Sequence, residues 1–415
     1  MILKRVVVTG LGALTPIGNT LQEFWEGLKK GESGAAPITR FDSAQFKTKF
    51  ACEVKNFDVG NFMDRKEARK MDPFAQYAMV AVDEAVKDAN LPLQELDLNR
   101  IGVIWGSGIG GLLTFQEEVK SYAKGDGTPR FNPFFIPKMI PDLSAGHISI
   151  KYGFRGPNYV TVSACASSTN ALYDAFTYLR LGKADIIVSG GSEAAVCEAG
   201  VGGFNALRAL SERNDSPETA SRPYDKDRDG FVLGEGAGAL ILEEYEHAKK
   251  RGAKIYGEII GGGMSSDAYH ITAPHPDGSG IIQVMYNALE EAGIKPEDVD
   301  YINTHGTSTP LGDIGEIKAI QQVFGQHAYQ MNISSTKSMT GHLLGAAGAI
   351  ETIACLLAIN QSVIPPTINH FNDDPGLDPK LNMTFNKAQE RTVKVALSNT
   401  FGFGGHNFSI LLKKV

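Results

Sequence analysis

Two kinds of hydrophobic pattern alternate along this chain. Short runs rich in β-branched and apolar residues, bounded by glycine or small polar residues, are typical of buried strands. Longer segments whose apolar positions recur every three or four residues are typical of amphipathic helices. The pattern predicts strands over residues 6–9, 101–105, 159–162, 185–189, 238–243, 255–260, 299–304, 333–336, 393–398 and 407–412. It predicts helices over residues 21–30, 64–89, 167–181, 244–251, 280–293 and 346–359.

The alternation restarts near residue 252. Strands that alternate with helices favour an α/β fold with mainly parallel sheets. The chain has 415 residues, beyond the ~250–300 at which a single core usually divides. We therefore expect two similar α/β halves, residues 1–252 and 253–415, as a duplication would produce. Residues 121–140 are rich in glycine, proline and phenylalanine, and we expect them to form a lid or excursion from the first half.

Composition and charge exclude several classes of protein. The hydrophobic and charged fractions, 42% and 21%, are those of an ordinary globular chain, and the net charge of −7 argues against nucleic-acid binding. The four cysteines lie far apart without a C-x-x-C pair, which argues against zinc ribbons and favours reduced thiols in the cytoplasm. The first residues lack a signal-peptide pattern, and we expect no run of about 18 apolar residues and so no membrane-spanning segment.

Cys165 lies where a predicted strand meets a predicted helix. Serine and threonine residues that suit a helix start follow it, and Gly182 suits the helix end. At a helix N-terminus, free N–H groups and the helix dipole favour a thiolate, and we expect the pKa of Cys165 to be lowered to about 4–7. The same N–H groups suit an oxyanion. The alternative is an inert cysteine buried in the core.

Three later turns carry further candidate chemistry. His305 follows a buried strand in a turn of small residues, the place where α/β sheets put ligands. Lys337 and His342 lie in another strand-to-helix turn, and Glu351 on the next helix is placed to pair with Lys337. The last turn, 401–405, is Phe-Gly-Phe-Gly-Gly, which leaves backbone N–H groups open. Taken singly, each of these turns is also compatible with a structural role.

Two other features have simple alternatives. Residues 106–111 match G-x-G-x-x-G after a strand, but no second strand ending in an acidic residue follows, so we expect a tight turn and no dinucleotide site. Ile109 in this turn is expected to line a pocket. The basic residues near position 66 are either a solvated face or a docking site for an acidic partner, a contact that salt would weaken. The docking candidates are Lys66, Arg69, Lys70, Lys124, Arg130 and Arg208.

In combination these motifs resemble one family. A cysteine at a strand-to-helix turn, then His305-Gly-Thr-Ser-Thr, then Lys337-Ser-Met-Thr-Gly-His342, then Gly402-Phe-Gly-Gly is similar to the β-ketoacyl-acyl-carrier-protein synthases, and the resemblance covers essentially the whole chain. The segments 265–270, 228–233 and 335–340 resemble the elongating synthase II type. His406 and Ser163 depart from residues that are usual there, which bears on chain preference and rate more than on the type of reaction.

The resemblance implies a fold, a reaction and a set of roles. The fold would be thiolase-like, with two α/β halves stacked as five layers, αβαβα. The reaction would be a decarboxylative Claisen condensation, in which malonyl-acyl-carrier-protein extends an acyl group held on Cys165 by two carbons. No metal or organic cofactor is implied, because phosphopantetheine arrives on the carrier protein. A homodimer is also implied.

The implied roles of single residues follow the family pattern. His305 and His342 would donate hydrogen bonds to the malonyl thioester, while Lys337 with Glu351 tunes the field around them. The remaining roles are these: Phe401 and Gly402 for the oxyanion hole and gating, Ile109 and Phe204 for the acyl pocket, and Thr307 and Thr309 for pantetheine.

The resemblance leaves related activities as alternatives. A thiolase would need a second catalytic cysteine late in the chain, and the late turn has none. Chain-initiating synthases and chalcone synthases use Cys-His-Asn, which Lys337 and His342 do not match. A non-catalytic polyketide synthase partner subunit lacks the nucleophile that Cys165 provides. A type II polyketide ketosynthase of the same fold remains an alternative.

Overall fold

The computed structural model describes residues 3–415, which form ten main strands arranged in two groups of five. Within the first group the order is β5-β4-β6-β7-β1, and within the second it is β10-β9-β13-β14-β8. When the five strands of each group are counted in chain order, both groups have the same spatial order: third, second, fourth, fifth, first. In each group the first two pairings are parallel and the last two antiparallel. The two halves thus share one topology.

The strands have clear bounds and mostly extend the predicted runs. Those of the first group are β1 (Val6–Leu14), β4 (Ile101–Gly106), β5 (Asn158–Thr161), β6 (Ile186–Glu193) and β7 (Gly236–Glu244). Those of the second are β8 (Gly257–Ser266), β9 (Tyr301–Asn303), β10 (Asn332–Ser334), β13 (Val395–Gly402) and β14 (His406–Lys413). The short strands are β2 (Ala36–Pro37), β3 (Phe50–Ala51), β11 (Val363–Ile364) and β12 (Gln389–Glu390).

Helices cover both sheets and separate them. The first half contains α1 (Leu21–Lys30), α2 (Arg65–Ala68), α3 (Pro73–Asp88), α4 (Leu112–Lys124), α5 (Phe135–Met139), α6 (Leu143–Tyr152), α7 (Ser167–Arg180), α8 (Glu198–Ala206) and α9 (Tyr245–Lys250). The second contains α10 (Ser279–Ala292), α11 (Pro310–Phe324), α12 (Lys337–Thr340) and α13 (Ala347–Gln361).

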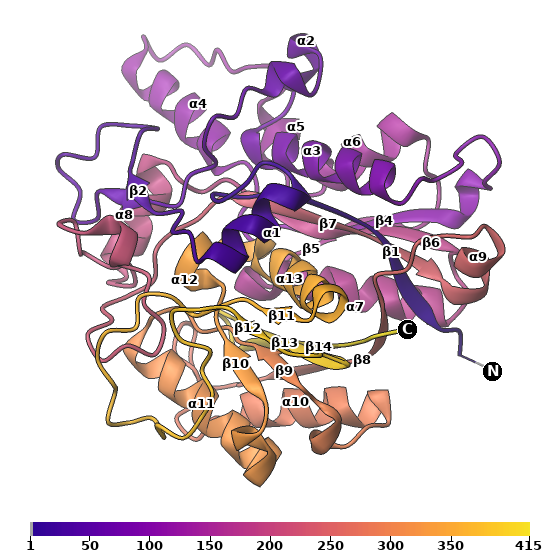
Figure 1. The fold of residues 1–415 in the computed structure, drawn as a ribbon. Helices are drawn as coiled ribbons and strands as arrows, with labels where there is room; N and C mark the ends of the chain where they lie inside the picture. The colour runs from indigo at the N-terminus through magenta and orange to yellow at the C-terminus, as the bar shows by residue number, and fades with distance from the viewer. Residues whose placement is uncertain (1–2) are drawn as a thin grey trace.

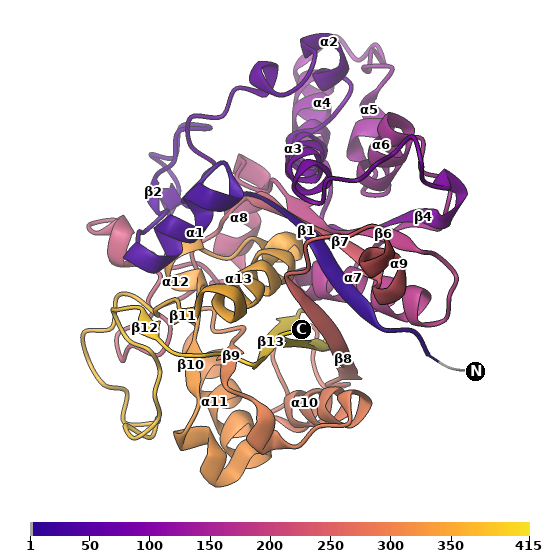
Figure 2. The ribbon, with the colours of Figure 1, turned by 45° about the vertical axis from the view of Figure 1, so that its right-hand side comes forward.

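The layers are stacked α, β, α, β, α (Figure 1), as the sequence predicts. Helices α3 and α6 cover the outer face of the first sheet, and α10 covers the outer face of the second with α11 against it. Helices α7 and α13 lie between the sheets, and both sheets contact them (Figure 2). The two helices meet at their N-terminal turns, where the Ala349 N–H donates to Ser168 Oγ at 2.9 Å. This middle layer brings the start of each helix close to the other.

The apolar pattern explains the burial of α13. The segment Leu344–Gln361 has a mean hydropathy of 1.4, long and apolar enough to cross a membrane, yet 89% of it is buried inside the protein. The expectation that no such stretch exists is therefore wrong. Because both faces of α13 pack against sheets, its hydrophobicity serves the core.

Several other local predictions need correction. The single helix expected over residues 64–89 is two helices, because Asp72 caps a new start and Pro73 occupies the first turn of α3. Residues 121–140, expected to form a lid or excursion, hold the end of α4 and all of α5, and their role as a lid stays a prediction. Helices α6, α8 and α11 were not predicted, since glycine interrupts them or proline begins them. Helix α4 was not predicted either, although its own residues include neither glycine nor proline. The limit between the halves at residues 252 and 253 stays a prediction.

Candidate functional site

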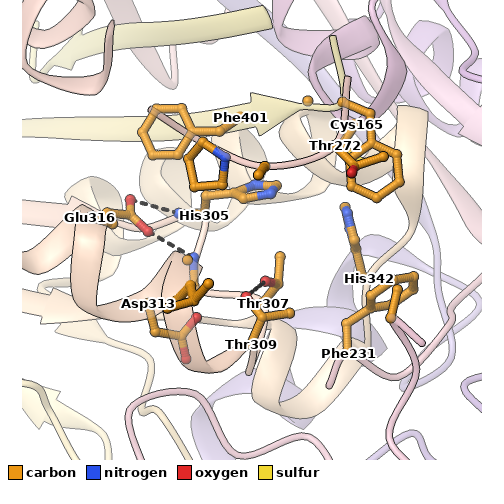
Figure 3. A pocket seen from close by; sticks show the side chains of 18 of the residues that line it. Cys165, Phe231, Thr272, His305, Thr307, Thr309, Asp313, Glu316, His342 and Phe401 are labelled. Carbon is orange, nitrogen blue, oxygen red and sulfur yellow. Dashed lines mark hydrogen bonds between the residues drawn. The ribbon is translucent and has the colours of Figure 1, made fainter. Parts of the chain in front are cut away.

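One cavity of about 400 Å³ gathers side chains from both halves of the molecule (Figure 3). Cys165 comes from the first half, and the two histidines come from turns that follow β9 and β10. The hairpin between β13 and β14 closes one side. Of the predicted site residues, the cavity is lined by Cys165, Phe204, Arg208, His305, Thr307, Thr309, His342, Phe401 and Gly402.

The turn that carries Cys165 has an unusual backbone. Strand β5 ends at Thr161, and Ala164 has a φ of 50°, a left-handed conformation that a non-glycine residue rarely adopts. The Ser167 hydroxyl holds this turn by donating to the Ala164 carbonyl at 2.6 Å and accepting from the Ser163 N–H at 3.0 Å. As predicted, Cys165 then lies just before the first residue of α7.

Among the described cysteines, Cys165 is the one that lines the cavity, and it is partly exposed there. Cys52, Cys197 and Cys355 are buried and unpaired. Burial raises the pKa of the Cys165 thiol to about 12, while the Lys337 charge and the backbone N–H groups of Phe403 and Cys165 act against that rise. The predicted lowering of this pKa is therefore wrong for the free protein, because the apolar surroundings outweigh the helix N-terminus.

The glycine-rich hairpin lies directly against the nucleophile turn. A Cβ on Gly402 would come within 2.6 Å of the Ser163 carbonyl and 3.2 Å of the Cys165 nitrogen. Gly402 therefore permits a backbone approach that a side chain would block. The Phe401 ring lies 5.6 Å from the His305 ring, between centroids, which places it over the histidine side of the cavity. These positions agree with the family roles of Phe401 and Gly402, which remain predictions.

A buried carboxylate holds the turn that carries His305. Glu316 on α11 accepts hydrogen bonds from the backbone N–H groups of His305 and Gly306, each at 2.9 Å. It also accepts from Asn399 on β13 at 3.3 Å. Sequence reasoning missed Glu316, although an acidic residue in the helix after the histidine turn was a usable signal. Burial raises the pKa of Glu316 to about 7, against the effect of these amide donors.

His342 is held by the other half of the chain. Its backbone N–H donates to the Val232 carbonyl at 2.8 Å, and its carbonyl accepts from the Gly234 N–H at 2.9 Å. Its ring packs edge-on against Phe231, with centroids 5.3 Å apart. Phe231 in turn contacts Phe204, so an aromatic wall that the sequence did not predict orients the imidazole.

The two imidazoles face each other as neutral groups. Their ring centroids are 5.3 Å apart at an interplanar angle of 86°. Burial, and after it the Lys337 charge, lowers the pKa of both rings well below the ordinary value. The Nδ1 atoms of both rings have no hydrogen-bond partner among residues 3–415. Two neutral N–H donors on one cavity can stabilise a negative charge that develops on a bound oxygen.

Lys337 and Glu351 form a buried ion pair behind the histidines. Each side chain is 1% exposed, and the Lys337 ammonium contacts the Glu351 carboxylate directly. Burial raises the pKa of Glu351 to about 7, and the Lys337 charge acts against that rise. The pair therefore keeps a positive charge close to both imidazoles, which disfavours their protonation.

The predicted pantetheine residues lie on the cavity wall. The hydroxyls of Thr307 and Thr309 are 3.1 Å apart, and both side chains line the cavity together with the exposed Arg208. Buried Arg228 supports this turn by donating to the Thr309 carbonyl at 3.2 Å and the Pro310 carbonyl at 2.9 Å. The turn is thus rigid where its hydroxyls face the cavity.

Other predicted residues lie apart from the cavity. Ile109 is 38% exposed and is not among the lining residues. Lys66, Arg69 and Lys70 lie on α2 and just after it, at the opposite end of the molecule from α10 and α11 in both views (Figures 1 and 2). Arg130 is exposed in the α4–α5 connection and pairs with Asp126 at 3.6 Å. Residues 3–415 contain no group of three or more His, Cys, Asp or Glu side chains placed to hold a metal.

Comparison with protein families gives two adjacent matches. Residues 3–248 match the family described as Beta-ketoacyl synthase, N-terminal domain, and residues 256–371 match Beta-ketoacyl synthase, C-terminal domain.

Similar curated proteins share one description, 3-oxoacyl-[acyl-carrier-protein] synthase 2. The protein from Synechocystis sp. is 52% identical over 411 residues, which is 99% of this chain and 98% of the relative. A relative from Staphylococcus aureus is 50% identical with the same coverage. One from Coxiella burnetii is 49% identical and covers 99% of both chains.

Solved structures with the same fold are less similar in sequence. The ishigamide ketosynthase/chain length factor has a TM-score of 0.93 at 35% identity and covers both chains fully. A β-ketoacyl synthase from Burkholderia phymatum has a TM-score of 0.92 at 35% identity, over 99% of this chain and 100% of the other. A type II polyketide synthase acyl-carrier protein in complex with its ketosynthase, AntDE:AntF, has a TM-score of 0.90 at 36% identity over the full length of both chains.

Proposed function

This chain belongs to the β-ketoacyl synthase family, and from that premise we propose that it is a 3-oxoacyl-[acyl-carrier-protein] synthase of the elongating type in fatty acid synthesis. The observation that carries the proposal is a single cavity lined by the Cys165 thiol and by two neutral imidazoles. A thiol can hold an acyl group, and paired N–H donors can stabilise an enolate.

In the first step Cys165 accepts the acyl group. Its sulfur attacks the thioester carbonyl of an acyl-acyl-carrier-protein, and the bond between that carbonyl and the pantetheine sulfur breaks. The thiol proton leaves with the departing pantetheine sulfur. Backbone N–H groups of Cys165 and Phe401 hold the oxyanion of the tetrahedral intermediate. Because the resting thiol is protonated, as its raised pKa requires, this proton transfer is part of the step.

In the second step the malonyl group loses carbon dioxide. The electrons of the breaking carbon–carbon bond form an enolate on the thioester, and His305 and His342 donate hydrogen bonds to its oxygen. Neutral rings suit this role because they donate hydrogen bonds without supplying a proton. The Lys337–Glu351 pair maintains that neutral state.

In the third step the enolate carbon attacks the acyl carbonyl on Cys165. The carbon–sulfur bond breaks, the Cys165 thiolate takes up a proton from solvent water, and the product is a β-ketoacyl chain two carbons longer. Phe401 gates access to the acyl chain, and Phe204 lines its path. Thr307 and Thr309 bind the pantetheine arm.

Identity supports fatty acid elongation over the polyketide alternative. The synthase 2 relatives are 49–52% identical, whereas the polyketide ketosynthase structures are 35–36% identical. A thiolase is disfavoured because the late hairpin, residues 401–407, holds no cysteine. Cys165 itself disfavours a non-catalytic partner subunit.

The partner and setting belong to the same proposal. Acyl and malonyl groups arrive on acyl carrier protein, which docks through Arg208 at the cavity mouth and through Lys66, Arg69, Lys70 and Arg130. The chain works as a homodimer, with Ile109 lining the acyl pocket near the partner. It acts in the cytoplasm, which agrees with four unpaired cysteines. It needs no metal or organic cofactor beyond the phosphopantetheine of the substrate.

Mass spectrometry of the intact protein tests the proposal. After incubation with acyl carrier proteins that carry acyl groups of graded length, Cys165 gains one acyl mass and the other cysteines gain none. Cys165→Gln gains no acyl mass and makes no condensation product, but it still releases carbon dioxide from malonyl-acyl-carrier-protein. Acylation elsewhere, or loss of decarboxylation in a folded variant, contradicts the division of roles.

A further inference from the structure

The glycine-rich turn after β4 is filled by a carboxylate of the protein itself. Glu193, the last residue of β6, is fully buried. Its Oε2 accepts from the Gly108 N–H at 2.8 Å, and its Oε1 accepts from the N–H groups of Ile109 at 3.1 Å and Gly110 at 3.3 Å. The turn is therefore an anion-binding turn that is already occupied, and Glu193 is a buried acid that the condensation steps do not use.

The same carboxylate also holds a second turn. Its Oε2 accepts from the Gly345 N–H at 3.0 Å, and its Oε1 accepts from the Ser107 hydroxyl at 3.3 Å. Gly345 directly follows Leu344, which lines the cavity and has a φ of 47°. Glu193 therefore ties the turn after β4 to the turn that begins α13.

The two tied turns pack directly against each other, and both lead into one apolar cluster. Leu112, which follows the first turn, and Leu344, in the second, belong to the same cluster as Cys165 and Phe204. Ala195, two residues after Glu193, belongs to it too. An acyl chain on Cys165 has this cluster as its nearest apolar surroundings. The joint position of the two turns, which carry Leu112 and Leu344 beside Cys165, therefore bears on the room that a chain can occupy.

Glu193 holds the turns as an ionised group. Each of its oxygens accepts at least two hydrogen bonds, and every hydrogen-bonding group within reach among residues 3–415 is a donor. Burial raises the pKa of Glu193, and its four amide donors act against that rise. A glutamine has no matching orientation, because its NH₂ group would face two or more N–H or O–H donors on either side.

We infer that Glu193 is a positioning residue that limits the length of the acyl chain accepted on Cys165, by holding the Gly108–Gly110 turn against the Gly345 turn. The inference rests on the proposed function, because it concerns the acyl group on Cys165. Loosening the tie lets Leu112 and Leu344 move with their turns away from the cluster, which favours long chains. Short chains, which need less room, are affected less.

The test compares Glu193→Gln with Glu243→Gln. Glu243 is an equally buried glutamate at the far end of the first sheet, bound to Thr9, His247 and Arg251. Acylation of Cys165 by octanoyl- and myristoyl-acyl-carrier-protein is followed by intact-protein mass spectrometry. The Glu193→Gln variant should raise the ratio of myristoyl to octanoyl rates about tenfold over wild type, the effect of a small change in an apolar pocket. The Glu243→Gln variant should keep the wild-type ratio.

The outcomes separate the inference from the proposed function. If wild type is acylated and Glu193→Gln keeps the wild-type ratio or moves it toward octanoyl, the inference is overturned and the function stands. If wild type itself is not acylated on Cys165, the proposed function fails. An equal change in Glu243→Gln also overturns the inference, because loss of any buried carboxylate would then suffice.

A second variant and a second measurement keep the test decisive. Glu193→Asp keeps the charge but is one methylene shorter, so it cannot hold both turns. The ratio of myristoyl to octanoyl acylation rates should therefore move in the same direction as in Glu193→Gln. An unchanged ratio in Glu193→Asp overturns the inference even if Glu193→Gln does not fold. The Glu193 charge also raises the pKa of Cys165. Alkylation of Cys165 by iodoacetamide should therefore shift to lower pH in Glu193→Gln but not in Glu193→Asp, and the absence of this difference also overturns the placement of the charge.

Discussion

The turns that begin α7 and α13 occupy corresponding positions in the two halves and have nearly the same backbone. Ala164 and Leu344 have φ values of 50° and 47°, and each is the first residue of a short 3₁₀ turn that leads into the helix. The residue after the left-handed position is Cys165 in the first half and Gly345 in the second. One turn directs a thiol into the cavity, and the other directs a backbone N–H to Glu193.

The same left-handed turn conformation therefore serves two different purposes in the two halves. A non-glycine residue in the left-handed backbone conformation costs on the order of 1–3 kcal/mol of folding free energy, so both turns need support from their surroundings. In the first half the Ser167 hydroxyl supplies it, and in the second half a carboxylate from the other half does. Under the proposed function, the first half holds the acyl group on Cys165 and the second provides the histidines that stabilise the enolate. The following predictions test this division, from the largest effect to the smallest.

Replacement of either histidine should slow decarboxylation and leave the acylation of Cys165 intact. His305→Ala and His342→Ala should each slow decarboxylation of malonyl-acyl-carrier-protein by about 10²–10³-fold, because each removes one donor to the developing oxyanion. Acylation of Cys165 should continue in both variants. The measurement is carbon dioxide release, with His370→Ala, which lies outside the cavity, as the control. An unchanged release rate would refute the assignment.

Alkylation should single out the cysteine of the first turn. Iodoacetamide should modify Cys165 in the native protein while Cys52, Cys197 and Cys355 stay unmodified, because those three are buried. Since burial raises the pKa of Cys165 to about 12, the rate should rise about a hundredfold between pH 7 and pH 9. Peptide mapping measures both. A rate that levels off below pH 8 would restore the lowered pKa that the sequence predicts.

The carboxylate that holds the His305 turn should make stability depend on pH. The folded-state pKa of Glu316 is about 7, above its ordinary value of 4.5, so its protonated form favours folding. That stabilisation is complete below pH 4.5 and is lost as the pH rises through 7, a change of about 3 kcal/mol. Glu316→Gln should lack this part of the pH dependence in urea unfolding at pH 5 and pH 8. If wild type and Glu316→Gln show the same change in unfolding free energy between pH 5 and pH 8, the raised pKa of Glu316 is contradicted.

The turn at Gly345 should not tolerate a side chain, whereas an open glycine on a helix should. Gly345→Ala places a Cβ 2.8 Å from Glu193 Oε2 and closer still to the Gly108 nitrogen, and should cost about 1–3 kcal/mol of folding free energy. Gly315→Ala on α11, where a Cβ would meet nothing within 4 Å, should instead stabilise by about 0.5–1 kcal/mol. Thermal unfolding measures both. Equal stabilities would mean that the second turn has room for a side chain.

The sequence predicts where the strands lie along the chain and that Cys165 lies between a strand and a helix, because both features depend on local patterns. Apolar runs locate the strands, and the change from a strand pattern to a helix pattern places Cys165 near the start of α7, although no side chain caps that helix. The family motifs indicate that His305 and His342 share a site with Cys165, and all three residues line the same cavity.

What the sequence did not predict depends on distant contacts. The sign of the Cys165 pKa shift follows from burial by residues far along the chain. The supports at Glu316 and Glu193 hold backbone groups, which leave no pattern in side-chain spacing. Helix α11 begins with Pro-Leu-Gly and is stabilised by packing against α10, so its local pattern alone is weak.

The position of β1 constrains how this chain can fold as it is synthesised. Val6 pairs with Glu244 on one side and with Ile259 on the other, so the first strand lies at the join between the two sheets. Neither pairing can form until about 240 residues have emerged from the ribosome, and closing so long a loop is slow. Until then both edges of β1 are open, and a growing chain with unpaired edges is prone to aggregate. The seam that unites the two halves is therefore completed late in folding.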